Sequence, residues 1–478
     1  MQKSELKILF SEPLSSMDAV WGKFGKDSGT NNFLYGMASV AAYCKMKGFI
    51  NIKFIDPNIE CISKEKYASF LKDNKFDVVA FSSFTASITY TLETIRLVKK
   101  TLPGCIIVLG GIHASLLPEE TMQECKELDF VAIGEGEITF NELLESIISD
   151  KQYGNIDGIM WRKDGKIARN KPRQLVSDIN MLPMPLYDLF PMEKYQAQAT
   201  HSKVFPTYTM LVSRGCCFNC AFCNATDIHG RKVRYKSISL IMEEIKYLKE
   251  KFGARGITFY DSTFTANKNW VREFCNELIR QGIKITWDCS TRTDTIDEDL
   301  LKLMKMAGCW SVSFGIESGN QKSLNLIRKN NTVETNTKGV KLANRLGFFV
   351  ATNYIIGIPG EDYSDAMNTI KYAKKLGAHQ ALFYLPIPYP KTPLYDICKA
   401  ENTINPNATW KDYNALDFDN PIYINPKIGK KKMKELYNYA FKTYYRTPMV
   451  LLRNIAQLNS VDAFKKYLMA VKCYFKFQ

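Results

Sequence analysis

The sequence predicts an α/β protein in which two series of strand and helix units are followed by a helical tail. Short apolar runs alternate with amphipathic helical stretches over residues 1–150, and again from Thr207 to about Pro393. Between the two series, Lys171–Pro206 carries five prolines and little periodicity, which is typical of a linker. At 478 residues the chain is too long for one ordinary core. We therefore expect segments at 1–150, 151–206, 207–395 and 396–478.

The first series predicts a doubly wound, flavodoxin-like parallel sheet. Its expected strands are Leu6–Ser11, Asn51–Asp56, Phe76–Ser82, Cys105–Gly110 and Asp129–Ile133. Expected helices between them include Leu34–Lys47, Lys64–Asp73 and Thr91–Lys100. In such a sheet ligands bind at the carboxyl ends of the strands.

Three strand ends of this series are rich in small and polar residues: Ser82–Thr85, Gly110–His113 and Gly134–Glu137. Small residues allow a ligand to approach the backbone, and the helix N-termini that follow can bind anionic groups. Ordinary explanations remain open, since a glycine after a strand is often only a turn and a glutamate can cap a helix. After this series, Gly158–Ile167 predicts a hairpin that turns at Asp164-Gly165.

The second series predicts a partial (β/α)6 barrel with its site at the strand carboxyl ends. The expected strands are Thr209–Ser213, Gly256–Asp261, Ile285–Ser290, Ser311–Ile316, Ala351–Ile358 and Ala381–Ile387. The expected helices are Ser239–Lys251, Lys268–Gln281, Glu298–Ala307, Val333–Leu346 and Tyr363–Leu376.

Three cysteines, Cys216, Cys220 and Cys223, follow the first strand of the second series with the spacing C-x3-C-x2-C. Soft thiolates on one short loop suit an iron–sulfur or a zinc site. Structural zinc usually has four protein ligands, and no second close pair of cysteine or histidine follows. A four-iron cluster on three cysteines leaves one iron open for an exchangeable ligand. The alternatives are a zinc loop or three incidental cysteines.

This loop, with Phe222 directly before its last cysteine, resembles that of the radical S-adenosylmethionine (SAM) enzymes. In that family the open iron of a [4Fe-4S] cluster binds the amino and carboxylate groups of SAM. Cys217 departs from the pattern, because proline usually follows the first cluster cysteine. Farther along, Pro386–Tyr395 resembles the stretch that closes the barrel in the same class, with Lys391 where glycine is commoner.

The three strand ends of the first series, upstream of this loop, resemble the cobalamin-binding (B12-binding) domain at the N-terminus of one large radical SAM class. The resemblance implies cobalamin contacts from Ser83, Thr85, Gly110, Gly111, His113, Gly134, Glu135 and Gly136. The D-x-H-x-x-G signature that supplies a histidine to cobalt in other cobalamin proteins is absent. His113 is therefore not assigned as an axial ligand.

The same resemblance assigns a role at the SAM site to residues at five positions along the barrel. Phe222 lies beside the adenine, Tyr260 and Asp261 contact the methionine part, and Arg292 pairs with the SAM carboxylate or with substrate. Glu317 accepts two ribose hydroxyls, and Gly357 and Ile358 approach adenine through their backbone. For Asp261 a helix N-cap is the alternative, and for Glu317 a surface cap.

The resemblance implies reductive cleavage of SAM to a 5′-deoxyadenosyl radical that abstracts hydrogen from an unactivated carbon, with cobalamin-dependent C-methylation as the favoured outcome. The cofactors carry this chemistry, while the protein orients them. Radical cyclisation, dehydration or rearrangement without methyl transfer is the rival. An iron–sulfur sensor or nucleic-acid-binding protein is the alternative from another class, and the chain has no recognisable signature for it. The family also implies an electron donor such as flavodoxin or ferredoxin.

Composition favours a cytoplasmic protein in an anaerobic setting. Ten of the thirteen cysteines are scattered without framework spacing, which is typical of reduced thiols. No apolar run approaches the ~18 residues that span a bilayer. The net charge is +15, and the segment Asn425–Gln478 holds twelve Lys/Arg against two acids. A basic tail implies an anionic partner.

This tail predicts helices at Lys430–Gln457 and Val461–Phe475, with aromatic and basic residues interleaved. Either the apolar stripe packs on the barrel, or the helices rest on anionic lipid at the inner face of the membrane. The second interpretation allows a lipid-linked substrate in place of an ordinary small molecule. The loop Pro13–Phe33 and the tail are expected to shape the substrate pocket, and no nucleic-acid partner is expected.

Overall fold

The computed structural model describes residues 1–14, 33–149, 151–195 and 202–455 and divides them into two compact units. The first unit contains the described residues up to Lys194, apart from Phe33, together with Asp227–Gly230. The second unit contains Tyr195–Thr226 and the chain from Arg231 onward. Most of the expected loop Pro13–Phe33 and the expected helix Val461–Phe475 lie outside the described residues.

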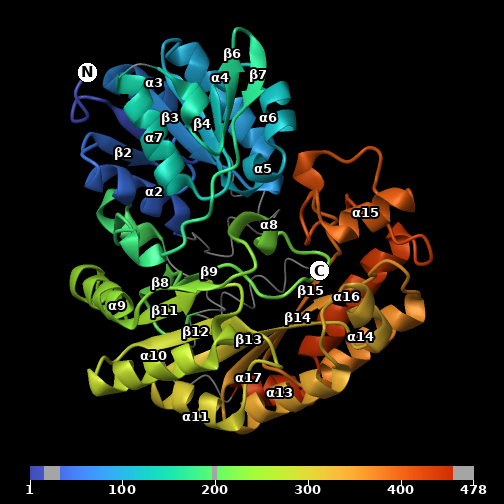
Figure 1. The fold of residues 1–478 in the computed structure, drawn as a ribbon. Helices are drawn as coiled ribbons and strands as arrows, with labels where there is room; N and C mark the ends of the chain where they lie inside the picture. The colour runs from blue at the N-terminus through green and yellow to red at the C-terminus, as the bar shows by residue number, and fades with distance from the viewer. Residues whose placement is uncertain (15–32, 150, 196–201, 456–478) are drawn as a thin grey trace. The chain divides into compact units, whose positions relative to one another are not determined.

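The first unit is built on a sheet whose first five strands are parallel, in the order β2-β1-β3-β4-β5 (Figure 1). This is the flavodoxin-like order, so the predicted fold is confirmed. Ile8 of β1 lies opposite Ile52 of β2 and Val78 of β3. The strands are β1 Ile8–Ser11, β2 Ile52–Ile55, β3 Val78–Ser82, β4 Ile106–Gly110 and β5 Phe130–Ala132, and the helices are α2 Tyr35–Met46, α3 Lys64–Asn74, α4 Ile88–Thr101, α5 Gly111–Leu116, α6 Pro118–Glu124 and α7 Gly136–Ile148.

The predicted hairpin is confirmed, and it extends this sheet to seven strands. β6 (Ile159–Lys163) pairs antiparallel with β5 and with β7 (Lys166–Arg169). Asp164 and Gly165 both have positive φ, 49° and 75°, as the tightest hairpin turns require. The proline-rich stretch that follows is not a free linker along its whole length, since Val176, Ile179 and Leu182 pack against Tyr43 of α2. These residues belong to the first unit, and burying their apolar side chains stabilises it.

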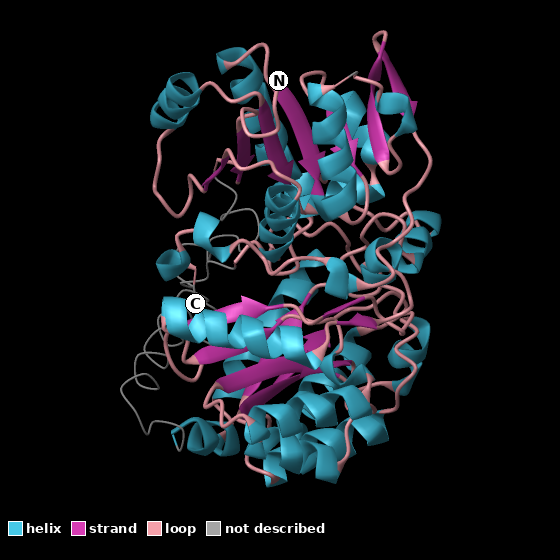
Figure 2. Ribbon diagram, turned by 60° about the vertical axis from the view of Figure 1, so that its left-hand side comes forward, coloured by secondary structure: helices cyan, strands magenta, loops and turns pink. Residues whose placement is uncertain are grey.

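The second unit is built on six parallel strands in chain order, β8-β11-β12-β13-β14-β15, so the predicted partial (β/α)6 barrel is confirmed. Figure 1 shows α9, α10, α11, α13 and α14 along one side of this sheet, and Figure 2 shows its strands as a separate magenta layer. The strands are β8 Thr207–Met210, β11 Gly256–Phe259, β12 Thr286–Thr291, β13 Cys309–Glu317, β14 Phe349–Ile355 and β15 Gln380–Tyr384, and the helices are α8 Ala225–His229, α9 Ile238–Phe252, α10 Lys268–Arg280, α11 Glu298–Met306, α12 Gln321–Leu326, α13 Val333–Arg345 and α14 Tyr363–Leu376.

The first barrel strand is shorter than the predicted Thr209–Ser213. It ends at Met210, and Ser213 and Arg214 form a separate short strand, β9, that pairs antiparallel with β10 (Arg234–Tyr235). The chain therefore leaves the barrel before the cysteines and returns after them. This two-stranded pair frames the cysteine loop at its base.

Local signals fix most helix starts of the second unit. The side chains of Ser237, Asn267, Asp297, Thr332 and Asp362 each accept a backbone N–H at the start of α9, α10, α11, α13 and α14. Such caps satisfy donors that have no partner within the helix. Buried aromatic side chains from β11, β12 and α10, among them Phe259, Phe274 and Trp287, pack with ring centroids 5.5–5.7 Å apart.

The chain after the barrel forms α15 (Pro393–Ala400), α16 (Lys430–Tyr445) and α17 (Pro448–Ile455). The apolar stripe of α16 is buried against β15 and α14, with Phe441 packed on Phe383 and the Tyr444 hydroxyl donating to Ala378 O at 2.7 Å. The packing interpretation of this tail helix is therefore confirmed for α16. Of the helices in the described ranges, none is long and apolar enough to cross a membrane.

Candidate functional site

The expected site residues of the barrel come together at one edge of its sheet. Asp261, Arg292 and Gly357 follow β11, β12 and β14, and Glu317 is the last residue of β13. These four strands are consecutive neighbours in the sheet. Because all six strands are parallel, these positions share the carboxyl edge with the cysteine loop that follows β9.

The cysteine loop is held at its middle by two backbone hydrogen bonds. Ala221 N donates to Ile327 O at 2.8 Å, and Leu394 N donates to Ala221 O at 2.9 Å. Around this fixed point Cys216 and Cys220 are half-buried, while Cys217 and Cys223 are exposed. The backbone of the loop is therefore fixed at its middle, while its cysteines differ in exposure.

Burial raises the pKa of the half-buried Cys220 thiol, and the Lys329 ammonium opposes the rise. In the described part of the chain, no three His, Cys, Asp or Glu side chains converge closely enough to chelate a single metal ion. A four-iron cluster is larger than one ion and separates its thiolate ligands more widely. Three cysteines on one loop, with a cation nearby, fit such a cluster.

Asp261 does not cap a helix, which was the alternative interpretation of this residue. Its buried carboxylate accepts from Val212 N at 3.2 Å and from Ser213 N at 2.6 Å, and the Ser213 hydroxyl donates to it as well. Burial raises the pKa of Asp261 to about 6, although these hydrogen bonds oppose the rise. The carboxylate thus connects the end of β11 to the chain that enters the cysteine loop.

Arg292 is buried beside the cysteine loop. Its guanidinium pairs with both carboxylate oxygens of Asp294, at 2.8 and 2.6 Å, and stacks 3.9 Å from the ring centre of Phe218. The third nitrogen, Nη1, is buried and has no hydrogen-bond partner among the described residues. A buried donor without a partner is costly, so this nitrogen favours an acceptor from a ligand.

Glu317 is neither exposed nor a helix cap, so the surface-cap alternative is wrong. Its Oε1 accepts from Lys329 Nζ at 2.8 Å, and both side chains are buried. Glu317 has φ 64°, and a Cβ on Gly315 would lie 2.5 Å from Oε1. Glycine at 315 therefore leaves room for the ion pair. The sequence analysis missed Lys329, because a lysine in a loop twelve residues away carries no signal of pairing.

The turn Gly357–Glu361 is closed by its own glutamate. The buried carboxylate of Glu361 accepts from Gly357 N and Ile358 N, both at 3.0 Å, and from the Ser323 hydroxyl of α12 at 2.5 Å. Burial raises the pKa of Glu361 to about 7. The N–H groups of Gly357 and Ile358 both donate to Glu361. The expected backbone contact to adenine therefore cannot use these two donors.

Phe222 packs between two apolar clusters of the second unit. One contains Ile327 and Ile358, and the other contains Leu394 and Tyr423. Ile358 of the glycine-rich turn and Phe222 of the cysteine loop are thus brought together, as a shared adenine site requires. Tyr260 directly follows β11 and is half-buried, and burial raises the pKa of its phenol.

In the first unit, the strand ends of β3 and β4 approach each other closely. Gly111 has φ 91°, and a Cβ there would lie 2.6 Å from Ser83 N. Ser83 N donates to Gly110 O at 3.2 Å, and His113 N donates to Ser83 O at 3.1 Å. Gly111 is thus required by the loop itself. Burial lowers the pKa of His113 to about 4, and Thr85 is also buried.

The third strand end, after β5, is more open. Gly134 has φ 81°, and a Cβ there would meet nothing within 4 Å. At Gly136 a Cβ would lie 3.2 Å from Val40 Cγ2, so this glycine permits close packing of α7 on α2. Glu135 accepts from Val176 N at 2.9 Å and thereby holds the chain that follows the hairpin.

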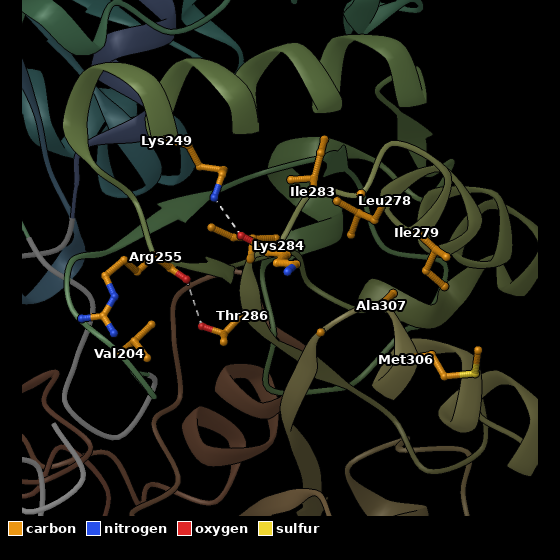
Figure 3. Close-up of a pocket in the computed structure, with 13 residues that line it drawn as sticks. Val204, Lys249, Arg255, Leu278, Ile279, Ile283, Lys284, Thr286, Met306 and Ala307 are labelled. Carbon is orange, nitrogen blue, oxygen red and sulfur yellow. Dashed lines mark hydrogen bonds between the residues drawn. The ribbon is translucent and has the colours of Figure 1, made fainter. Parts of the chain in front are cut away.

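A cavity of about 560 Å³ opens at the opposite edge of the barrel, at the amino ends of β11, β12 and β13 (Figure 3). Lys249 donates to Lys284 O at 2.7 Å along its wall, and the Thr286 hydroxyl donates to Arg255 O at 3.2 Å. None of the expected site residues lines this cavity. Sites in barrels of this kind lie at the other edge.

Glu361 generates a pH prediction. Its pKa is about 7 in the folded state against 4.5 for an ordinary glutamate, so its contribution to stability is present below pH 4.5 and is lost as pH rises to about 7. Because Glu361→Gln resembles the protonated acid, unfolding free energies of the wild type should fall relative to this variant by about 3 kcal/mol over that window. Denaturant titrations at several pH values check this, and a difference that is independent of pH would contradict it.

Two family sequence models match this chain, one mainly in each of its two structural units. The sequence model of the radical SAM superfamily matches residues 210–373, and that of the B12 binding domain matches residues 28–144. An uncharacterised methyltransferase of Pyrococcus horikoshii is 32% identical over 427 residues, which cover 89% of this chain and 91% of the relative. A cytidylyl-2-hydroxyethylphosphonate methyltransferase of Streptomyces wedmorensis is 27% identical over 403 residues, covering 76% and 75%.

Among solved structures, the radical SAM methyltransferase TsrM from Kitasatospora setae superposes with a TM-score of 0.71 at 16% identity, covering 93% of this chain and 89% of that chain. The cobalamin-dependent SAM radical enzyme OxsB superposes with a TM-score of 0.72, also at 16% identity, covering 97% and 70%. At such identity these likenesses concern the fold. The P. horikoshii relative and the two matched domains show that this chain is an enzyme of the radical SAM family that carries an N-terminal B12-binding domain, with a [4Fe-4S] cluster, SAM and cobalamin as its cofactors.

Proposed function

We propose that the protein is a methyltransferase that uses cobalamin and SAM to methylate carbon on a small-molecule substrate. The observation that carries this proposal is the meeting of the cysteine loop with Asp261, Arg292, Glu317 and Gly357 at one edge of the barrel, in a chain that also has a B12-binding domain. The names of two relatives, both called methyltransferases, support the reaction class.

When bound, the cofactors would supply the radical and methyl-transfer chemistry: the cluster an electron for the cleavage of SAM, and cobalamin a carrier for the methyl group. The protein holds the cluster through Cys216, Cys220 and Cys223. An electron donor such as flavodoxin or ferredoxin is needed to reduce it. Radical rearrangement or cyclisation without methyl transfer is the alternative for the same pair of domains.

Arg292 is the residue of this chain that we assign to the SAM carboxylate. Asp294 and Phe218 fix the plane of its guanidinium, and this leaves only Nη1 to find an acceptor. A carboxylate is the strongest partner for such a donor. Asp261 is assigned an indirect role, because its oxygens are occupied by the backbone that leads into the cysteine loop.

Glu317 is assigned to the ribose hydroxyls. Lys329 occupies its Oε1 and leaves the second carboxylate oxygen to accept from a ligand. The hydrogen bond from the lysine also fixes the orientation of the carboxylate. On this proposal the ion pair presents one oriented oxygen toward the sugar.

The first prediction of the proposed function concerns the cluster. Replacing Cys216, Cys220 or Cys223 by Ala should abolish the [4Fe-4S] spectrum and SAM cleavage after anaerobic reconstitution, because each removes an iron ligand. Cys217→Ala is the matched control on the same loop, and it should leave both largely intact. Iron and sulfide analysis with EPR checks this. A protein that holds zinc and no iron would contradict the proposal.

The second prediction separates ligand binding from folding at Glu317. Glu317→Gln should weaken SAM binding but also leaves Lys329 buried without its partner, which costs roughly 3–5 kcal/mol of stability. The double variant Glu317→Gln, Lys329→Met removes that cost. SAM affinity should be reduced in both variants, while thermal unfolding should recover in the double variant. Normal SAM affinity in the double variant would return Glu317 to a structural role.

The third prediction concerns cobalamin. Gly134→Val should prevent corrinoid binding, because it fills the open space at a strand end. Gly165 is the matched control: it has a similar positive φ of 75°, equally open surroundings and a place at the hairpin tip. Both valine variants share the backbone strain, but only Gly134→Val should lose the corrinoid absorbance. Equal corrinoid content in the two would contradict the site.

The reaction itself is tested by product mass. Metabolites of a strain that carries the enzyme should include a product one CH2 heavier than a compound that accumulates in the deletion strain. Labelled methionine should transfer its methyl group to that product. A product of unchanged carbon count would assign the enzyme to the alternative without methyl transfer.

A further inference from the structure

A short segment after the barrel, Tyr423–Asn425, lies between two parts of the site that we assign to adenine. The segment is outside both matched family models, which end at residues 144 and 373. Tyr423 packs in the same apolar cluster as Phe222 of the cysteine loop. Two residues later, Asn425 contacts the glycine-rich turn Gly357–Glu361.

Asn425 is fully buried and all of its amide atoms are used. Its Nδ2 donates toward three carbonyls of the turn: Gly357 O at 3.3 Å, Ile358 O at 3.2 Å and Glu361 O at 3.0 Å. Its Oδ1 accepts from Lys427 N at 2.9 Å and from Ile428 N at 3.2 Å. A side chain so fully bonded holds the two pieces of chain in one relative position.

The glycine-rich turn depends on such an outside partner. The carboxylate of Glu361 satisfies the N–H groups of Gly357 and Ile358, but it cannot donate to their carbonyls. The residues Gly357, Ile358 and Glu361 are buried, so their carbonyls would be costly to leave unpaired. Within the turn, Glu361 N donates to Ile358 O at 3.0 Å. Asn425, 64–68 residues away in the chain, supplies the donor for Gly357 O and Glu361 O and a second one for Ile358 O.

Packing adds a second constraint from α16. Gly357 has φ 80°, and a Cβ there would lie 2.4 Å from Met433 Cε and 2.5 Å from Met433 Sδ. Met433 therefore packs directly on the glycine, and it is itself buried. The helix is fixed on the barrel through Tyr444 and Phe441. Met433 of α16 thus restricts the position of the turn.

We propose that Asn425, with Tyr423 and Met433, forms a positioning element for the adenine end of the SAM site. Asn425 and Met433 fix the turn that carries Ile358, and Tyr423 supports Phe222 on the other side. The proposal rests on the proposed function, and within it on the adenine roles of Phe222 and Ile358 that the resemblance to the radical SAM enzymes implies. The region beyond the barrel is then a part of the SAM site, although it touches the cofactor only through other residues.

The test uses the full-length, anaerobically reconstituted enzyme with three probes: SAM, S-adenosylhomocysteine and methionine. Asn425→Asp keeps the acceptor for Lys427 and Ile428 but replaces the donor by an oxygen facing three carbonyls. We expect the affinities for SAM and S-adenosylhomocysteine to fall by about tenfold or more. The change that methionine produces in the EPR spectrum of the reduced cluster should persist, because the methionine end is not touched.

Asn454→Asp is the matched control. Its Nδ2 donates to His379 O at 2.9 Å. His379 directly precedes β15, at the amino end of that strand. The same substitution thus removes a part-buried donor in the same unit without touching the turn Gly357–Glu361. It should leave the affinity for SAM unchanged. If Asn425→Asp fails to take up iron, Met433→Ala replaces it, with Met433→Leu as the variant expected to restore SAM affinity.

The outcomes separate this inference from the proposed function. A wild-type enzyme with a cluster but no SAM binding would overturn the proposed function itself. A wild type that binds SAM, with equal affinity in Asn425→Asp or in Met433→Ala, would overturn the positioning element alone. A parallel loss of the methionine response and of SAM affinity would also overturn it, because the effect would then not belong to the adenine end.

Discussion

Carboxylates buried at the carboxyl edge of the barrel determine where the loops above the sheet run. An ionised acid away from water is costly unless it is paired or hydrogen-bonded. Asp261 is satisfied by the chain that enters the cysteine loop, Glu361 by the glycine-rich turn, and Glu317 by Lys329. Moving any of these loops would leave a buried carboxyl group without its partners, so each acid fixes one loop relative to the sheet.

The residues assigned to SAM are therefore supported by residues that do not contact it. The cysteine loop is bonded at Ala221 to the turn after α12 and to the start of α15, and it is aligned from below by Asp261. The guanidinium of Arg292 is oriented by Asp294 before any ligand arrives. Preorganisation of this kind lowers the cost of binding and of holding reactive groups in place.

The region beyond the barrel is strongly basic and also packs an apolar stripe on the barrel. Its basic residues carry much of the net charge of the chain, yet the apolar stripe of α16 is buried on β15 and α14. Lysines can remain on the outer face of such a helix while its aromatic side chains pack inward. Burial of the stripe then connects the helix to the glycine-rich turn through Met433.

The sequence alone determined the features that depend on neighbours along the chain. These include the strand and helix order, the turn at Asp164-Gly165, the cysteine spacing and the helix Tyr363–Leu376 with its observed bounds. Periodicity, caps and turn chemistry act over a few residues, so a single sequence contains them. Only the tertiary structure decided that Asp261 binds backbone 49 residues away, and that Asn425 closes a turn 68 residues before it. Such partners are chosen by packing in three dimensions, for which the chain carries no local signal.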